Sequence, residues 1–201
     1  GPRDVVVISL DQDSFEKLDL ASIEGFPRPL YTRLLEQLQS YQPKRVVFDI
    51  LFQGRTSEPS ADYDLANAMK RHSTVNAGIG IAVRPGDAKK RQLTRVAPIF
   101  AQSSQELGHM WLEKDNGVVR RFAPKYSDPR IPFEPISTAA LAKSGDAAAL
   151  PSRRDFINYY GPAGSVPTIS IWRFFEQGAL PPVENLKGKY VYIGWGVRTM
   201  S

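Results

Sequence analysis

The sequence predicts a single α/β domain with a mixed, largely parallel β-sheet flanked by helices, plus a β-hairpin. Apolar, β-branched runs alternate with amphipathic helical patterns as far as Val83, and strands joined by helical crossovers form parallel sheets. Two strand-like runs then flank Asn116-Gly117, a dipeptide that is a strong hairpin signal. The chain has 201 residues, 42 % of them hydrophobic, which is enough for one sizeable core.

Each element has its own local signal. Apolar runs rich in valine and isoleucine predict buried strands, at residues 5–10, 45–52, 75–83 and 189–194. Leucine and alanine at helical spacing predict amphipathic helices. One helix is expected to start at Ser14, and four others are expected at residues 30–41, 62–72, 134–143 and 171–177. The runs 107–114 and 118–126 form the predicted hairpin, and the polar stretch 84–95 is expected to be a loop.

The composition narrows the function classes. The net charge of +5 and the pI near 9.5 suit an anionic partner, but no nucleic-acid-binding motif accompanies them, so we expect no nucleic acid. The absence of cysteine excludes disulfides, thiolate metal sites and a cysteine nucleophile. No run reaches the length of a transmembrane helix. Gly1-Pro2 is interpreted as a remnant of a cleaved tag, residues 3–201 as one domain, and both ends as cuts in a longer polypeptide.

Acidic residues follow the first two predicted strands and permit an enzymatic interpretation. Asp11 and Asp13 have the Asp-x-Asp spacing of phosphatases of the haloacid-dehalogenase kind, in which one carboxylate attacks phosphorus and Mg²⁺ neutralises the phosphate. Asp49 ends a second strand that could lie beside the first, and Asp62 and Asp64 could join the cluster. The lysine and the later aspartate pair of that site have no counterpart, so catalysis is not supported.

A structural interpretation accounts for the same carboxylates. Asp13 suits a helix N-cap with Glu16 three residues later, and Asp62 and Asp64 suit the first turn of a helix. For Asp11 and Asp49 the sequence leaves both interpretations open, because ligands usually bind at the carboxyl edge of an open sheet. No cofactor motif is present, and neither histidine has a metal-ligand spacing. We therefore expect no cofactor and no metal.

Seven segments occur in an order that resembles one family. They are VVVISLDQDSFEKL, FPR before an amphipathic helix, RVVFDILF, EPSADYDLANAM, LGHMWLEKDNGVVRR, INYYGPAGSVPTIS and LKGKYVYIG. Together they resemble the second class of CHASE domain, the cyclase/histidine-kinase-associated sensory extracellular module, over residues 4–194.

The resemblance implies an extracytoplasmic sensor in the inner membrane of a bacterium, tethered by flanking transmembrane helices, with this domain periplasmic or extracellular. It implies a cytoplasmic output module, most often an adenylate or guanylate cyclase or a histidine or Ser/Thr kinase, and receptors of this kind commonly act as homodimers. Positions matching the family pattern include the candidate ligand-binding residues, which are Asp11, Arg28, Asp49, Asp64, Arg120, Asn158 and Tyr159.

The sequence thus predicts a sensor domain that converts an extracytoplasmic event into a conformational change. The preferred binding surface is the carboxyl edge of the sheet around Asp11, Arg28, Asp49 and Asp64. A periplasmic protein-interaction module without a small-molecule ligand is the main alternative, and an Mg²⁺-dependent hydrolase is the third. A well-formed pocket would favour a small molecule, and a flat apolar patch with exposed aromatic residues would favour a protein partner.

Overall fold

A computed structural model provides the fold. It describes residues 4–20, 26–72, 75–84, 87–94, 96–112, 114, 116–121, 133–146, 156–162, 164–176 and 186–196. The expected tag remnant at residues 1–2, residues 122–126 of the expected hairpin and the last residue of the expected helix 171–177 lie outside the described residues.

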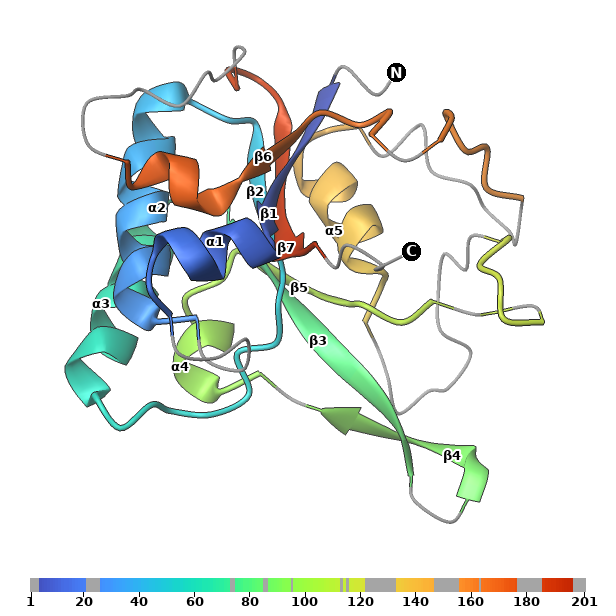
Figure 1. The fold of residues 1–201 in the computed structure, drawn as a ribbon. Coiled ribbons are helices and arrows are strands. Elements are labelled where there is room, and N and C mark those ends of the chain that lie inside the picture. The colour runs from blue at the N-terminus through green and yellow to red at the C-terminus, as the bar shows by residue number, and fades with distance from the viewer. Residues whose placement is uncertain are drawn as a thin grey trace.

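The strands and helices alternate along the chain as expected (Figure 1). Their order is β1 (Val5–Leu10), α1 (Gln12–Lys17), α2 (Arg28–Tyr41), β2 (Arg45–Asp49), α3 (Pro59–Arg71), β3 (Val75–Arg84), β4 (Asp87–Thr94), α4 (Pro98–Ala101), β5 (Glu106–His109), α5 (Ile136–Lys143), β6 (Thr168–Ser170), the 3₁₀ helix η4 (Ile171–Phe174) and β7 (Tyr190–Trp195).

One sheet connects these strands in the order β4-β3-β2-β7-β1-β6, and β5 also pairs with β3. All pairs are parallel except β3 with β4, so the fold class predicted from the sequence is confirmed. The last strand, β7, lies between β1 and β2 and pairs in register with both. Because β1 and β7 are parallel neighbours, the start of β1 and the end of β7 lie at opposite ends of the strands, and β7 ends at the carboxyl edge of the sheet.

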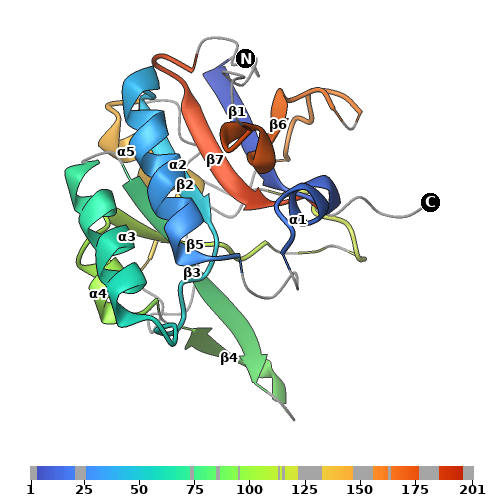
Figure 2. The ribbon, with the colours of Figure 1, turned by 60° about the vertical axis from the view of Figure 1, so that its left-hand side comes forward.

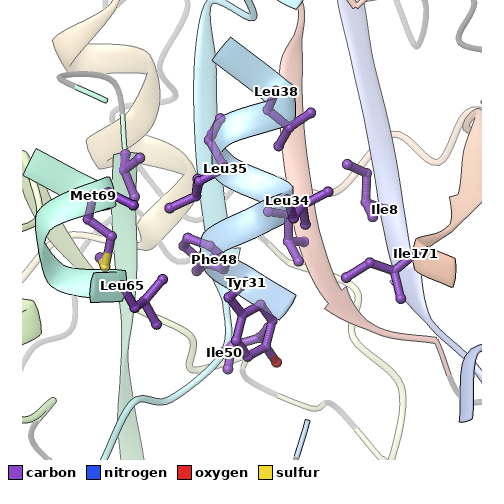
Figure 3. Close-up of a cluster of buried hydrophobic side chains, with 14 of the residues drawn as sticks. Ile8, Tyr31, Leu34, Leu35, Leu38, Phe48, Ile50, Leu65, Met69 and Ile171 are labelled. Carbon is purple, nitrogen blue, oxygen red and sulfur yellow. The ribbon is translucent and has the colours of Figure 1, made fainter. Parts of the chain in front are cut away.

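Helices cover both faces of the sheet. Figures 1 and 2 show α2 and α3 on one face and α5 on the other. Because side chains alternate along a strand, β2 serves both sides: Val46 and Phe48 pack in the larger cluster, while Val47 packs with Ile136 in the smaller one. In the larger cluster, shown in Figure 3, α2 contributes three leucines with no exposed surface, Leu34, Leu35 and Leu38. The burial of each contributes roughly 1.5–3 kcal/mol.

The antiparallel hairpin lies elsewhere than expected. It is formed by β3 and β4, so the expectation of a loop at residues 84–95 is wrong. Asn116 and Gly117 do form a turn, with φ values of 49° and 82°, and Gly117 tolerates this backbone because it has no Cβ. The preceding strand, β5, is instead parallel to β3, and the described residues after the turn contain no named strand before α5.

Close contacts hold both ends of α5 against the sheet, and the first residues of this helix lie at the carboxyl edge. At the C-terminal end, the buried guanidinium of Arg45 donates to the Lys143 carbonyl at 2.8 Å and to the Ser144 hydroxyl at 3.3 Å. A cation there also complements the helix dipole. At the N-terminal end, Gly108 of β5 lies so close that a Cβ would come 2.7 Å from the Ile136 nitrogen. Only glycine permits that approach.

Candidate functional site

Two hollows lie at the carboxyl edge of the sheet in the part of the chain that the structure describes. The first, here called the Tyr31 pocket, has a volume of about 390 Å³, and its walls include Phe26, Arg28, Tyr31, Ile50, Thr56 and Trp195. The second, the Asp49 pocket, has a volume of about 150 Å³, and its walls include Asp49, His109, Trp111, Arg121, Ile136 and Ile157. The predicted edge is thus hollowed, but of the candidate residues only Arg28 lines the first pocket and only Asp49 lines the second.

Asp11 is the N-cap of α1 and joins three elements. It directly follows β1, and its carboxylate accepts hydrogen bonds from the Ser14 amide at 3.0 Å and the Ser14 hydroxyl at 2.6 Å. The hydroxyl of Ser170, at the end of β6, donates to the same carboxylate. The expectation that Asp13 is the N-cap is therefore wrong: the helix begins at Gln12, two residues earlier than expected, and Asp13 lies in its first turn.

Asp11 and Asp49 do not lie on neighbouring strands. β7 lies between β1 and β2, with Gly194 paired to Ser9 on one side and to Asp49 on the other. Two strand spacings of about 4.8 Å separate the β1 and β2 backbones. Because the last strand of the chain fills this position, the expected proximity of the two carboxylates does not occur.

Arg28 pairs with Asp62 and not with Asp64. Its Nε lies 3.3 Å from an Asp62 carboxylate oxygen, with the side chains 13 % and 1 % exposed, and its guanidinium lies over the Phe52 ring at 4.7 Å. The second Asp62 oxygen accepts from the Thr56 amide at 2.8 Å. This buried pair therefore joins the start of α2, the loop after β2 and the first turn of α3.

Asp64 lies two residues further along α3 and is exposed. Residues 62 and 64 point in different directions because successive helical positions are about 100° apart. The described residues contain no group of three histidine, aspartate or glutamate side chains arranged to hold a metal ion. The structure thus separates the acidic residues that the enzymatic interpretation would bring together.

The Asp49 pocket contains two titratable groups with shifted pKa values. The Asp49 side chain is partly exposed at the mouth, but the neighbouring protein removes enough water from its carboxyl group to raise its pKa. His109 is 1 % exposed, and burial lowers the pKa of its imidazole. Both shifts favour the uncharged form of these two groups.

Arg120, Asn158 and Tyr159 lie on two short segments that run side by side and that also carry two residues of the Asp49 pocket wall, Arg121 and Ile157. The Ile157 amide donates to the Arg120 carbonyl at 2.9 Å, and Arg121 forms an antiparallel bridge with Phe156. The Tyr159 hydroxyl donates to the Val119 carbonyl at 2.6 Å. This side-chain hydrogen bond links the two segments.

Exposed hydrophobic side chains on and near these segments form a surface. It consists of Leu112, Val118, Phe156, Tyr159 and Tyr160, which are between 47 % and 66 % exposed, and we call it the aromatic patch. The Arg121 guanidinium lies over the Phe156 ring at 4.0 Å. The protein thus presents both features that were expected to discriminate between ligand classes, a pocket and an apolar patch.

Sequence reasoning missed several residues that shape this edge, among them Tyr31, Ser170 and Trp195, and it did not foresee the pairing of Asp62 with Arg28. Tyr31 falls on the apolar face of a helical pattern and looks like a core residue. Trp195 is the last residue of β7; its ring stacks on Phe15 with centroids 5.8 Å apart and an interplanar angle of 8°. The signal available in the sequence was the position of Phe26, Pro27 and Arg28 directly before a helix. A helix that follows a parallel strand begins at the carboxyl edge of the sheet, so residues at its start lie at that edge.

Comparisons with known proteins place the chain in a family. A search of curated proteins and a search of solved structures each returned no match. None of the helices within the described residues combines the length and the apolar character that a membrane span requires. A family model, described as the CHASE2 domain, matches residues 1–200. This match confirms the resemblance read from the seven segments, and the chain belongs to the CHASE2 family of extracellular sensory domains of signalling proteins.

Proposed function

We propose that the chain is the extracytoplasmic input domain of a bacterial membrane receptor, and that it regulates a cytoplasmic output module. The observation that carries the proposal is the family match over residues 1–200. CHASE2 domains are sensory and not themselves catalytic, so the reaction that the receptor controls belongs to another module. The output is an adenylate or guanylate cyclase, or a histidine or Ser/Thr kinase.

The fold offers a direct route from a bound signal to the end of the domain. Ile50 and Trp195 line the Tyr31 pocket, and they follow or end two neighbouring strands, β2 and β7. A ligand in this pocket would contact the point where β7 leaves the sheet. Stabilising one conformation of that exit by about 1–3 kcal/mol, a typical allosteric coupling, would change the output by 5- to 150-fold.

The location of the domain can be tested with single cysteines, because the sequence contains none. In the intact receptor, Asn67→Cys places a thiol on the exposed side of α3, and Ala68→Cys places one at a neighbouring position with no exposed surface. A membrane-impermeant maleimide should label Asn67→Cys in spheroplasts whose inner membrane is intact, and should label neither Ala68→Cys nor the unsubstituted protein at this site.

Labelling of Asn67→Cys only after lysis of the inner membrane would contradict the proposed location. If the cysteine is labelled from outside but removal of the whole domain leaves the output activity and its regulation unchanged, the proposed sensory role fails while the location stands. The two results separate the topology of the receptor from the function of the domain.

A protein partner is a second candidate for the signal, and the aromatic patch favours it. Five of the seven large hydrophobic residues that are exposed in the described part of the chain belong to this patch, and exposed apolar patches often mark protein interfaces. Tyr160→Ser removes an aromatic ring that is 65 % exposed. If a protein partner carries the signal, this variant should keep the stability of the domain and lose the response of the receptor.

Tyr63→Ser is the matched control, since Tyr63 is 51 % exposed and lies on α3, outside the patch. Equal responses from the two variants and the unsubstituted receptor would remove the case for a partner at the aromatic patch.

A further inference from the structure

We infer that the Tyr31 pocket binds a small molecule with an apolar body and a carboxylate group, and that the Tyr31 hydroxyl donates a hydrogen bond to this carboxylate. The inference rests on the proposed function and names the ligand class of the sensor. It depends on three features of the pocket: the Tyr31 hydroxyl, the N-terminus of a long helix, and described wall residues that carry no negative charge.

The Tyr31 hydroxyl is the first feature. Tyr31 is 2 % exposed, and its ring packs edge-on against Phe48 and Phe52 with centroids 5.7 and 5.6 Å away. Figure 3 shows its oxygen at the outer end of the ring, beside Ile50 and turned away from Leu34. No residue that the structure describes forms a hydrogen bond with this oxygen.

Tyr31 lines the pocket, so its hydroxyl can donate a hydrogen bond to water or to a ligand that occupies this space. Burial also raises the pKa of the phenol, so the hydroxyl keeps its proton and acts as a donor.

The N-terminus of α2 is the second feature. This helix has 14 residues, its N-cap is Pro27, and no side chain caps it. Pro29 has no amide hydrogen, and the Leu30 amide already donates to the Pro27 carbonyl at 3.0 Å. The Arg28 amide is therefore the donor that the first turn leaves for a ligand, at the end of the helix where the dipole favours negative charge.

The charge and polarity of the walls are the third feature. Among the described residues that line the pocket, Arg28 is the only charged one, and its guanidinium is held by Asp62 and by the Gly54 carbonyl at 3.3 Å. The side chains of Phe26, Ile50 and Trp195 supply apolar surface for the body of the ligand. The volume of about 390 Å³ is at the lower end of the range for small-molecule sites.

The test is an NMR titration of the 201-residue domain with benzoate, phenylacetate, indole-3-acetate and hexanoate at millimolar concentrations. Each acid is paired with its neutral primary amide. We expect at least one acid to shift the resonances of the Arg28 amide and the Trp195 indole, with an affinity higher than that of its amide.

Three variants test the assignment. Tyr31→Phe removes only the hydroxyl and should weaken the binding of that acid about tenfold, the effect of losing one hydrogen bond to a charged group, without lowering the stability of the domain. Tyr192→Phe removes a hydroxyl from the opposite face of the same sheet and should leave the affinity unchanged. Leu51→Trp fills the pocket from its partly exposed rim and should abolish binding.

Failure of every acid to shift these resonances would overturn the inference, as would equal affinity of Tyr31→Phe and the unsubstituted domain. Amides that bind as tightly as the acids would overturn the carboxylate assignment. None of these results touches the proposed sensory role, which the response of the intact receptor decides. Conversely, a receptor whose output ignores this domain would overturn the sensory role even if an acid binds in the pocket.

Discussion

Replacing Asp62 by alanine should lower the free energy of unfolding by about 3–5 kcal/mol, the cost of leaving one partner of a buried ion pair uncompensated. The Asp62 side chain is 1 % exposed and the Arg28 side chain 13 %. The substitution leaves the Arg28 guanidinium in a largely dry environment between α2 and α3, and it removes the acceptor of the Thr56 amide. Asp62→Asn keeps an oxygen near that amide and should cost less than alanine.

The exposed pair of Arg71 and Glu36 is the matched control. Its nitrogen–oxygen distance is also 3.3 Å, but the two side chains are 55 % and 54 % exposed. Water and salt screen such a pair, so Glu36→Ala should cost less than about 1 kcal/mol. The two ion pairs have the same nitrogen–oxygen distance and differ in exposure, so the difference between the two losses in stability measures the effect of burial.

Urea unfolding followed by far-ultraviolet circular dichroism gives both values on the same protein. The comparison uses midpoints with a shared slope, because a changed slope would signal an altered unfolded state. A cost for Asp62→Ala as small as that for Glu36→Ala would refute the reasoning, since it would show that Arg28 is solvated or finds another partner once Asp62 is removed.

Three further predictions follow from single contacts. Asp11→Ala removes an N-cap and should lower the free energy of unfolding by about 1–2 kcal/mol in urea; no loss would mean that its hydrogen bonds contribute nothing net. Gly108→Ala forces a Cβ against the Ile136 backbone and should cost about 3 kcal/mol, read as a lower melting temperature; an unchanged melting temperature would contradict the close approach. Burial lowers the pKa values of His72 and His109, so the unfolded chain takes up protons first as the pH falls below about 6.5. Stability in urea should therefore decline as the pH falls from about 7 to 5, more gently in His72→Gln, and a flat profile would refute the argument.

Local patterns predicted the helices and strands that bury apolar residues. In β1 and α2, the local sequence alone shows which side chains are buried, through an apolar run in β1 and the spacing of the leucines in α2. β4 was missed because its sequence, Asp87–Thr94, is rich in charged residues. A strand paired on one side only, as β4 is with β3, needs no apolar run.

The candidate site was only partly predictable, because its geometry depends on strand order. The position of β7 between β1 and β2 separates Asp11 from Asp49, and nothing in the local sequence of either strand encodes this order. The sequence could not show which of Asp62 and Asp64 pairs with Arg28, for a related reason. Which carboxylate of α3 faces Arg28 depends on how α3 packs against α2, and both residues suit a first helical turn.

The central claim is that the carboxyl edge of this sheet senses a signal and passes it to an output module. The most direct test measures the catalytic activity of the output module in the intact receptor, in membranes, while the carboxylate that binds the isolated domain is titrated. We expect the activity to change with the affinity measured for the domain, Tyr31→Phe to shift the midpoint about tenfold, and Tyr192→Phe to leave it unchanged. An output that stays constant while the pocket is saturated would show that this edge of the sheet does not sense the bound molecule.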